Sequence, residues 1–450
     1  METITTTEAC VEIASYCAAS MLTAALWITY GPAAAAAEAA FGWRNREVAL
    51  LSVWGPALGL LASPAAPRLV RRLGGPRNTT TAVCALCAGA AALRCAPGRG
   101  LPRLLLAHAS CALNGVGGVL ILSTPAMVAR DALDEPRRHL GTSTMLAANS
   151  LGGGLGFVAA AAAKDDVEGL LVYECAAALA ILALVAARRG VFRRDAPDGD
   201  ADAPLPAFGP LLKSRSYVLL AAGCGMTMGA FTGWLGVLTP LLESSGWAPR
   251  DANAVGVACC FAAAAAQVLS GALSTRRKRL AILSCNASAL AALFAFAVVA
   301  EAAPRRSPAA LALALVAAFG VVAPEGAIYE LATAPAPAPL EASAGAGLVF
   351  AFNLPMATFI LLDAVASPRQ LLWILVASNA LGLGLLAVEA ATADDRPIFL
   401  PDARPLNAEE EYRPLDAAAE PGILNNFPPW LPPPVRKSRR LPFSCGRSAA

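Results

Sequence analysis

The chain has 450 residues, of which 57% are hydrophobic and only 15% are charged, and its mean hydropathy is +0.56. A soluble protein carries about 25% charged residues, so this composition indicates a polytopic membrane protein. The formal net charge of +3 is small, and we therefore expect no nucleic-acid partner.

Hydrophobic runs of about 17–25 residues, the length that crosses a bilayer, form two groups of six. The first six lie near 10–37, 48–66, 79–96, 103–129, 141–163 and 167–187. The last six lie near 216–241, 251–273, 280–302, 308–332, 342–366 and 370–390. The third run is short and rich in cysteine and alanine, which makes it the weakest. The pattern predicts an all-α membrane protein with twelve transmembrane helices.

The polar, proline-bearing segment 188–215 separates the two groups and has the composition of a flexible linker. We expect an N-terminal six-helix bundle (1–187), a cytosolic linker (188–215), a C-terminal six-helix bundle (216–391) and a disordered cytosolic tail (392–450). Two six-span halves joined by a charged linker are typical of the major facilitator fold, whose halves rock about a site near the membrane midplane.

Loop charge predicts the orientation. With the N-terminus inside, the inner loops carry seventeen Lys and Arg residues and the outer loops carry ten. Basic residues concentrate in cytoplasmic loops, so both termini are predicted to be cytosolic.

Several short stretches between residues 20 and 390 match one known family in order. In the first half they are Trp27-Ile-Thr-Tyr-Gly31-Pro32, Ala49-Leu-Leu-Ser-Val-Trp54-Gly55-Pro56, Leu93-Arg94-Cys95-Ala96-Pro97, Ala112-Leu-Asn114-Gly115 and Asp134-Glu135 with Arg137. In the second half they are Gly229-Ala-Phe231-Thr-Gly233-Trp234-Leu-Gly236-Val-Leu238, Tyr329-Glu330-Leu331 and Glu341. Together they resemble the solute carrier 49 family, and within it the branch of the disrupted in renal carcinoma protein 2.

The resemblance implies proton-linked or facilitative transport. For this branch it implies export of vitamin B6-type compounds, above all pyridoxine, across an endolysosomal rather than a plasma membrane. Carriers of choline, ethanolamine or haem in the same family are alternatives. An alternative of another class is a receptor or scaffold that has the carrier fold but does not transport.

Two positions depart from the patterns of these families. In Val70-Arg71-Arg72-Leu73-Gly74, Arg71 stands where major facilitator proteins usually carry an acid that helps to latch the inner gate. A second acid that the family often places four residues after Glu330 is replaced by Ala334. We expect Arg71, Arg72 and Gly74 to belong to the gate.

Two tryptophans, Trp27 and Trp234, lie in the leading spans of the two halves. Aromatic walls on both sides of a cavity would hold a flat ring or a cation, so we expect both residues to bind substrate. The alternative is that they serve packing or interfacial anchoring.

Pro32, Pro56 and Pro240 bend helices and are hinge candidates, with packing an equal alternative.

Ionisable and amide side chains within the spans are the remaining candidates. Glu330 would bind substrate or a proton, and Glu325, five residues earlier, is a second proton-coupling candidate. His108, the histidine inside a predicted span, would shuttle protons, although a structural histidine is more common. Asn114 lies in a matched stretch and would bind substrate, whereas most intramembrane asparagines join helices.

The tail contains Tyr412-Arg413-Pro414-Leu415, which has the form of a tyrosine-based sorting signal. Tyr412 and Leu415 would contact a sorting adaptor. The other expected partners are a small-molecule substrate and the lipid bilayer, and we expect a monomer. No nucleophile–base constellation or metal cluster occurs in the sequence, so we expect neither an enzyme nor a cofactor.

Overall fold

The computed structural model describes residues 6–163, 166–188, 208–272, 277–302, 308–333, 336 and 338–393. Within these ranges the chain forms helices and no strands, and the helices belong to one compact unit. Every predicted span contains a helix, which confirms the predicted all-α class. Most of the predicted linker and tail, 189–207 and 394–450, lie outside the described residues.

We call the helices of the first six spans the first set. They are α1 Thr6–Ile28, α3 Asn45–Ala62, α5 Pro76–Arg94, α6 Gly100–Leu122, α8 Glu135–Ala163 and α9 Val167–Ala187, with the short α2 Ala34–Phe41, α4 Ala66–Arg72 and α7 Pro125–Ala132 between them.

The helices of the last six spans form the second set. They are α11 Arg215–Cys224, η2 Gly225–Gly229 and α12 Ala230–Gly236, which run on from one another, then α14 Pro249–Ala272, α15 Lys278–Ala302, α16 Pro308–Val322, α17 Glu325–Thr333, α18 Ala338–Leu362 and α19 Pro368–Thr392. Two short helices, α10 Gly209–Lys213 and α13 Leu238–Ser244, flank the first of these spans.

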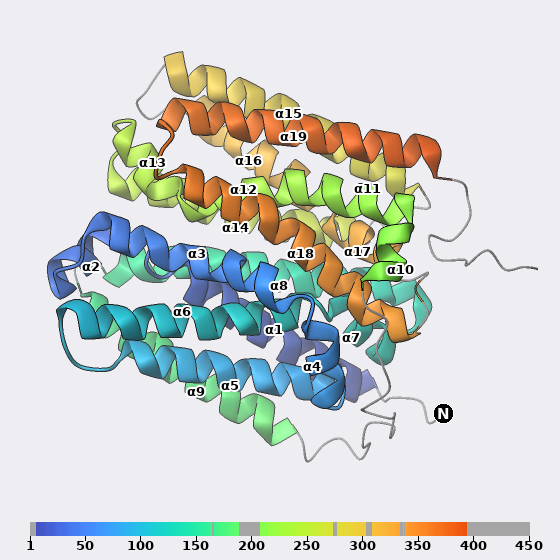
Figure 1. Ribbon diagram of the computed structural model, residues 1–450, viewed down its shortest axis with the longest axis horizontal. Helices are drawn as coiled ribbons and strands as arrows, with labels where there is room; N and C mark the ends of the chain where they lie inside the picture. Colours follow the sequence, from blue (N-terminus) through green and yellow to red (C-terminus); the bar gives the residue numbers. More distant parts are fainter. Residues whose placement is uncertain are drawn as a thin grey trace, which may run out of the picture. The chain divides into compact units, whose positions relative to one another are not determined.

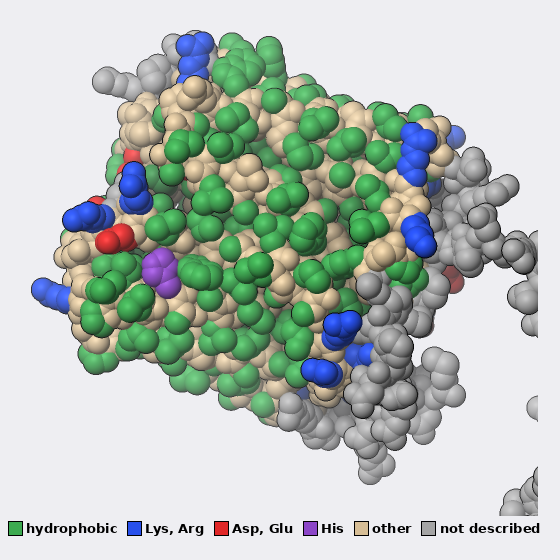
Figure 2. All heavy atoms as spheres, viewed as in Figure 1, with side chains coloured by type: hydrophobic (Ala, Val, Ile, Leu, Met, Phe, Trp, Pro, Cys, Tyr) green, Lys and Arg blue, Asp and Glu red, His purple; other side chains and the backbone are tan. Residues whose placement is uncertain are grey.

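Length and composition allow ten of the described helices to cross a membrane, or eleven if α3 and α4, bent by 80° relative to each other, form one span. Helix α5 is not among them because its first turns carry Arg77, Asn78 and three threonines. It nevertheless packs between α6 and α9 as the third helix of the first set. Figure 2 shows hydrophobic side chains over the middle of one face and most charged side chains toward its two ends.

The first set packs against the second along two pairs of long helices, α8 with α14 and α3 with α18 (Figure 1). Glycine allows the close approach of α8 and α14: a Cβ on Gly154 would lie 3.1 Å from the Cβ of Cys260. A Cβ on Gly271 would lie 2.6 Å from the Cβ of Ser143. Small residues at helix contacts are how membrane helices gain van der Waals packing without a hydrophobic driving force.

Two spans of the second set are irregular where they pass the centre of the molecule. The span of α11 and α12 contains the π-helical turn η2, where Gly225 and Gly229 lie against backbone oxygens of α18. The span of α16 and α17 is interrupted at Ala323-Pro324, because proline cannot donate the backbone hydrogen bond that would continue the helix. Irregular backbone at this depth is found where it lines a cavity or is covered by protein.

The two ends of the helices are distinguished by the direction of α1. We call the end where α1 begins the near end and the end where α1 finishes the far end, at the right and left of Figure 1. At the near end, Glu12 of α1 pairs with Arg77 of α5 (3.2 Å) and with Arg188 after α9 (3.3 Å). In the second set, Glu389 of α19 pairs with Arg279 of α15 (3.1 Å) and accepts a hydrogen bond from Ser216 of α11.

A third ionic group lies in the interior of the first set. The Arg94 side chain is fully buried and pairs with Glu174 of α9 at 3.2 Å. Its guanidinium also donates to Thr29 Oγ1 (2.9 Å), Ser110 Oγ (2.7 Å) and the Leu26 backbone oxygen (2.8 Å). Arg94 therefore joins α5 to α1, α6 and α9.

Removing this guanidinium is expected to destabilise the first set. Arg94→Met leaves Glu174 buried without its cation, which should cost about 3–5 kcal/mol. Thermal unfolding of the purified protein would measure the loss as a lower Tm, and the exposed Arg72→Met is the matched control. The double variant with Glu174→Gln should regain part of the Tm, and a double variant no more stable than Arg94→Met would contradict this account.

A cavity between the two sets of helices

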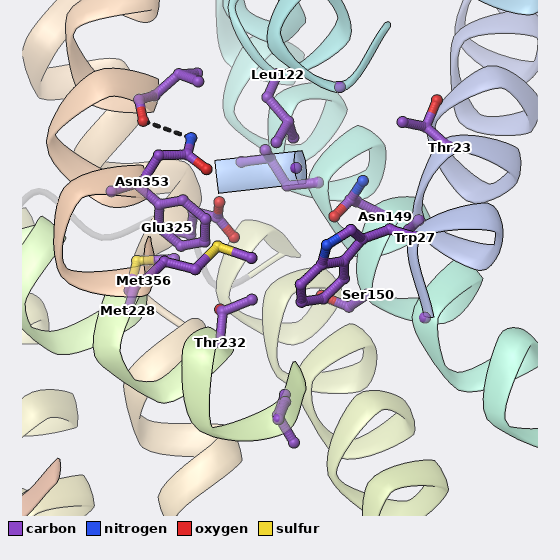
Figure 3. Close-up of a pocket in the computed structure, with 18 of the residues that line it drawn as sticks. Thr23, Trp27, Leu122, Asn149, Ser150, Met228, Thr232, Glu325, Asn353 and Met356 are labelled. Atoms are coloured by element: carbon purple, nitrogen blue, oxygen red, sulfur yellow. Dashed lines mark hydrogen bonds between the residues drawn. The ribbon is translucent and has the colours of Figure 1, made fainter. Parts of the chain in front are cut away.

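A cavity of about 170 Å³ lies between the two sets (Figure 3). Its polar lining residues include Thr23 of α1, Asn149 and Ser150 of α8, Thr232 of α12 and Asn353 of α18. Helices of both sets therefore contribute polar groups to one space.

Aromatic and sulfur-bearing side chains form part of the apolar wall. Trp27 of α1, Phe231 of α12 and Phe352 of α18 line the cavity, together with Met228 and Met356. Met228 lies in the π-helical turn η2, so the irregular part of that span borders the cavity. Flat rings and polarisable sulfur are suited to a ligand with an apolar, ring-shaped body.

Glu325 is the one charged residue among the described residues that line the cavity. Gln267 of α14 donates from its Nε2 to the Glu325 carboxylate, and its Oε1 accepts from Ser150 Oγ at 2.9 Å. Because Ser150 belongs to the first set, the Gln267 amide connects the cavity carboxylate with the opposite set of helices. In the sequence, Glu325 is a proton-coupling candidate only, and Gln267 and Ser150 carry no mark that predicts a role.

Amide side chains from three helices border the cavity, and each makes a hydrogen bond to backbone. Asn114 Nδ2 donates to the Thr23 oxygen at 3.0 Å, Asn149 Nδ2 to the Ser20 oxygen at 3.3 Å, and Asn353 Nδ2 to the Val349 oxygen at 2.7 Å. Asn114 thus lies at the cavity, as expected of a substrate-binding residue, while its amide also joins α6 to α1. Asn149 and Asn353 also line the cavity, although the sequence did not distinguish them from other intramembrane asparagines.

The structure places Trp234 away from the cavity. Its side chain is fully buried between Phe231 and Phe296, with ring centroids 5.4 and 5.7 Å away. Thr232 faces the cavity, and Trp234, two residues later at 100° per residue, points about 200° round the helix. The expectation that Trp27 and Trp234 form opposite cavity walls therefore holds in position for Trp27 alone.

Glu330 also lies outside the cavity lining, toward the near end of α17. Its Oε2 is 2.9 Å from Nδ1 of His139 and 2.8 Å from Nζ of Lys278. His139 belongs to α8 and Lys278 to α15, so Glu330 joins the two sets. The sequence placed His139 in a loop, but α8 begins at Glu135, six residues before the predicted span, and His139 is buried in it.

Further contacts close the near end between the sets. Arg130 of α7 pairs with Glu341 of α18, and Tyr329 Oη donates to the Leu122 backbone oxygen at 2.9 Å. A Cβ on Gly345 of α18 would collide with the Ser123 backbone oxygen. Glu341, one of the matched positions, thus has a cation from the opposite set as its partner.

His108 lies toward the far end of α6 and outside the cavity lining. Its Nδ1 accepts a hydrogen bond from Trp54 Nε1 at 2.8 Å. His108 is therefore hydrogen-bonded within the first set, which corresponds to the structural role that was the alternative to a proton shuttle.

The proline and arginine candidates lie at helix ends and bends. Pro56 is inside α3, Pro32 follows α1, and Pro240 is in the short α13. Arg71 and Arg72 end α4, which packs against α18 of the other set, and Gly74 turns the chain toward α5 with φ of 82°.

The sorting residues Tyr412 and Leu415, and Ala334, lie outside the described residues.

Sequence reasoning missed one group that carried a visible signal. Glu174 is an acid in the middle of the predicted span 167–187, and an ionisable residue within a span calls for a partner. Arg94 is that partner, eighty residues earlier. By contrast, no local pattern marks Gln267, Ser150 or His139, whose importance depends on helix packing.

Two comparisons with known proteins agree with this architecture. A model of the Major Facilitator Superfamily matches residues 16–360. The solute carrier family 49 member 4 homologue of Xenopus laevis is 26% identical over 256 residues, which cover 51% of this chain. The matched region is 56% of the length of that relative.

The family match spans most of the chain, from α1 to α18, and agrees with a cavity enclosed between the two sets. The chain belongs to the Major Facilitator Superfamily, a family of secondary transporters built from two six-helix halves.

Proposed function

We propose that this protein is an alternating-access carrier of a small, polar, ring-bearing metabolite, with pyridoxine-like vitamin B6 compounds as the first substrates to test. The observation that carries the proposal is the cavity enclosed between the first and second sets, with side chains of both sets in its wall. In this fold, substrate sites lie near the midplane where the two halves meet.

The size of the cavity favours a ligand with one ring. Its volume is about 170 Å³. A protein cavity of about 150 Å³ accommodates benzene, so a single six-membered ring with small substituents fits and the four-pyrrole ring system of haem does not. This argues against the haem-type alternative.

The lining chemistry favours a neutral or cationic ligand with hydroxyl groups. Thr23, Asn149 and Thr232 offer hydrogen bonds, and Glu325 supplies the negative charge. An indole and two phenyl rings offer faces for stacking or for a cation. Pyridoxine has this combination of ring and hydroxyls, and its choice follows from the resemblance to the solute carrier 49 family. Choline and ethanolamine satisfy the charge and can place an ammonium group over the ring faces, but they lack a flat ring that would stack on them.

Glu325 is the proposed proton-coupling group. A carboxyl group at a cavity between two sets of helices can exchange a proton with cavity water and change its attraction for the ligand. The Gln267 amide can transmit that change to Ser150 of the first set. We assign Glu330, by contrast, to the near-end gate with His139, Lys278, Arg130 and Glu341.

The cellular setting is part of the same proposal. The near end carries the predicted inner loops, so we infer that it faces the cytosol, with both chain termini on that side. An endolysosomal membrane follows from the resemblance, with Tyr412 and Leu415 as the proposed adaptor contact. We propose a monomer, because the carrier fold encloses its cavity within one chain.

Transport is the first test. Tracer pyridoxine should enter proteoliposomes that contain the purified protein in a saturable way, faster with an inward proton gradient. Trp27→Ala should lower uptake at least tenfold because the cavity loses its largest aromatic wall, whereas Trp373→Ala, which removes an indole from α19, should not.

Competition by unlabelled choline distinguishes a carrier of pyridoxine-like compounds from a carrier of choline-like compounds. Choline that displaces tracer pyridoxine at comparable concentration would favour the choline-type carrier. Specific pyridoxine binding to folded protein without any flux would favour the non-transporting receptor instead.

Glu325→Gln should separate binding from proton drive. The amide keeps the size and hydrogen-bonding capacity of the carboxyl group but cannot release a proton. Uptake should lose its stimulation by the proton gradient, while exchange of pyridoxine across the membrane without a gradient continues. Glu243→Gln, which alters an exposed acid near the far end, is the control. Gradient stimulation that survives in Glu325→Gln would exclude this carboxyl group as the coupling site.

Glu330→Gln should loosen the near end. It removes the anion shared by His139 and Lys278, so amides at the start of α8 and the end of α17 should exchange hydrogen for deuterium several-fold faster. Glu243→Gln, which alters an exposed acid near the far end, should leave these rates unchanged. Equal exchange in Glu330→Gln and the unmodified protein would show that this pair does not hold the sets together.

A further inference from the structure

A second, narrower pocket adjoins the cavity on its far-end side. It is lined by Gly31, Pro32, Ser52, Phe157, Gly236 and Thr239, and by three residues that also line the central cavity, Trp27, Ile28 and Leu235. These three side chains therefore form a partition with the central cavity on one side and a small space toward the far end on the other.

The Trp27 indole occupies the middle of this partition between two glycines of opposite sets. A Cβ on Gly55 of α3 would lie 2.7 Å from Trp27 Nε1, and a Cβ on Gly236 of α12 would lie 3.1 Å from Cη2. At Gly55 the distance is shorter than real Cβ contacts, so the ring would have to move, whereas at Gly236 a shift of a few tenths of an ångström would suffice. The indole therefore lies where it does because both positions lack a side chain.

A single polar contact holds the ring. Trp27 Nε1 donates to the Ser52 backbone oxygen of α3 at 3.2 Å, so the indole is fastened to the first set. On the side of the second set, the ring contacts the Gly236 backbone and the apolar core of that set by van der Waals packing. If the two sets separate at the far end, these packing contacts are lost and the indole keeps its hydrogen bond to α3.

We propose that Trp27 is the far-end gate of the cavity and that the second pocket is the passage behind it. The assignment rests on the proposed carrier function, and it gives Trp27 a role beyond that of a ring-stacking wall. With the sets together, the indole fills the space between Gly55 and Gly236 and seals the cavity. With the sets apart, the ring can turn, and the central cavity becomes continuous with the space bordered by Pro32 and Thr239.

The gate can be tested by the accessibility of a cavity cysteine, without any substrate. Cys260 lines the central cavity, whereas Cys84 is buried elsewhere in the first set. A charged, membrane-impermeant methanethiosulfonate forms a mixed disulfide with a thiolate and releases a sulfinate. The rate of adduct formation at Cys260, measured by peptide mass spectrometry with Cys84 as reference, therefore reports entry into the cavity.

Sidedness is obtained in sealed proteoliposomes with an affinity tag after residue 450. Helix α19 ends at the near end, so a protease added outside removes the tag from molecules whose near end faces outwards. Molecules that retain the tag present their far end to the reagent, and their Cys260 adducts alone are counted.

Trp27→Ala is expected to raise the rate at Cys260 at least tenfold in these molecules. Gly55→Ala, whose methyl group would lie 2.7 Å from Nε1 and must displace the indole, should raise it several-fold. Gly384→Ala is the matched control because no atom lies within 4 Å of the added methyl group. Its rate should equal that of the unmodified protein.

An unchanged Cys260 rate in folded Trp27→Ala would overturn the gate, even if the same variant fails to transport pyridoxine. If Trp27→Ala does not fold, as judged by its elution from a sizing column, Gly55→Ala decides the question in the same way. Failure of pyridoxine transport together with the predicted rise at Cys260 would overturn the substrate and leave the gate in place.

Discussion

Charge inside an apolar slab must be paired, and this constraint organises the structure. No water solvates an ion buried among membrane helices, so an unpaired ion there is costly. Arg94 and Glu174 pair between α5 and α9, and the guanidinium also donates to Thr29, Ser110 and the Leu26 backbone oxygen. Glu325 differs, because an amide rather than a cation faces it and the cavity borders it. That difference is the physical reason to place binding and proton chemistry at Glu325.

The second constraint is close approach between the two sets. Helices α8 and α14 meet at Gly154 and Gly271, and α18 meets η2 at Gly225 and Gly229. Contacts of this kind are made by backbone and small atoms, so they can be lost and regained without repacking large side chains. A carrier that alternates between states needs such surfaces between its halves, and it needs its bulky side chains inside each half. Trp234, packed between Phe231 and Phe296, is one of those internal side chains.

The order and approximate positions of the spans could be predicted from the sequence because most of them contain a long apolar run. The short helices α2, α4, α7, α10 and α13 were not predicted. The place of Trp27 at the cavity followed from a matched stretch. The choice between Glu325 and Glu330 could not be predicted, since it depends on the break at Pro324, which sets how α17 is turned. The same limit applied to Trp234, whose direction changes by about 200° from Thr232 within two residues. His139 was missed because the predicted start of its span was six residues late.

The near-end ion pairs recur in equivalent places of the two sets. Glu12, Arg77 and Arg188 join the first, third and sixth spans, and Ser216, Arg279 and Glu389 join the seventh, ninth and twelfth. In each set, these contacts hold three spans together at the near end, which must open in the proposed cycle. Opening of the near end would therefore tilt each six-helix set as one rigid body and would not separate its helices from one another. In such a rigid-body tilt, separation of the sets at one end brings their other ends together, so breaking the Glu330 contacts at the near end would press Trp27 more tightly between its two glycines at the far end.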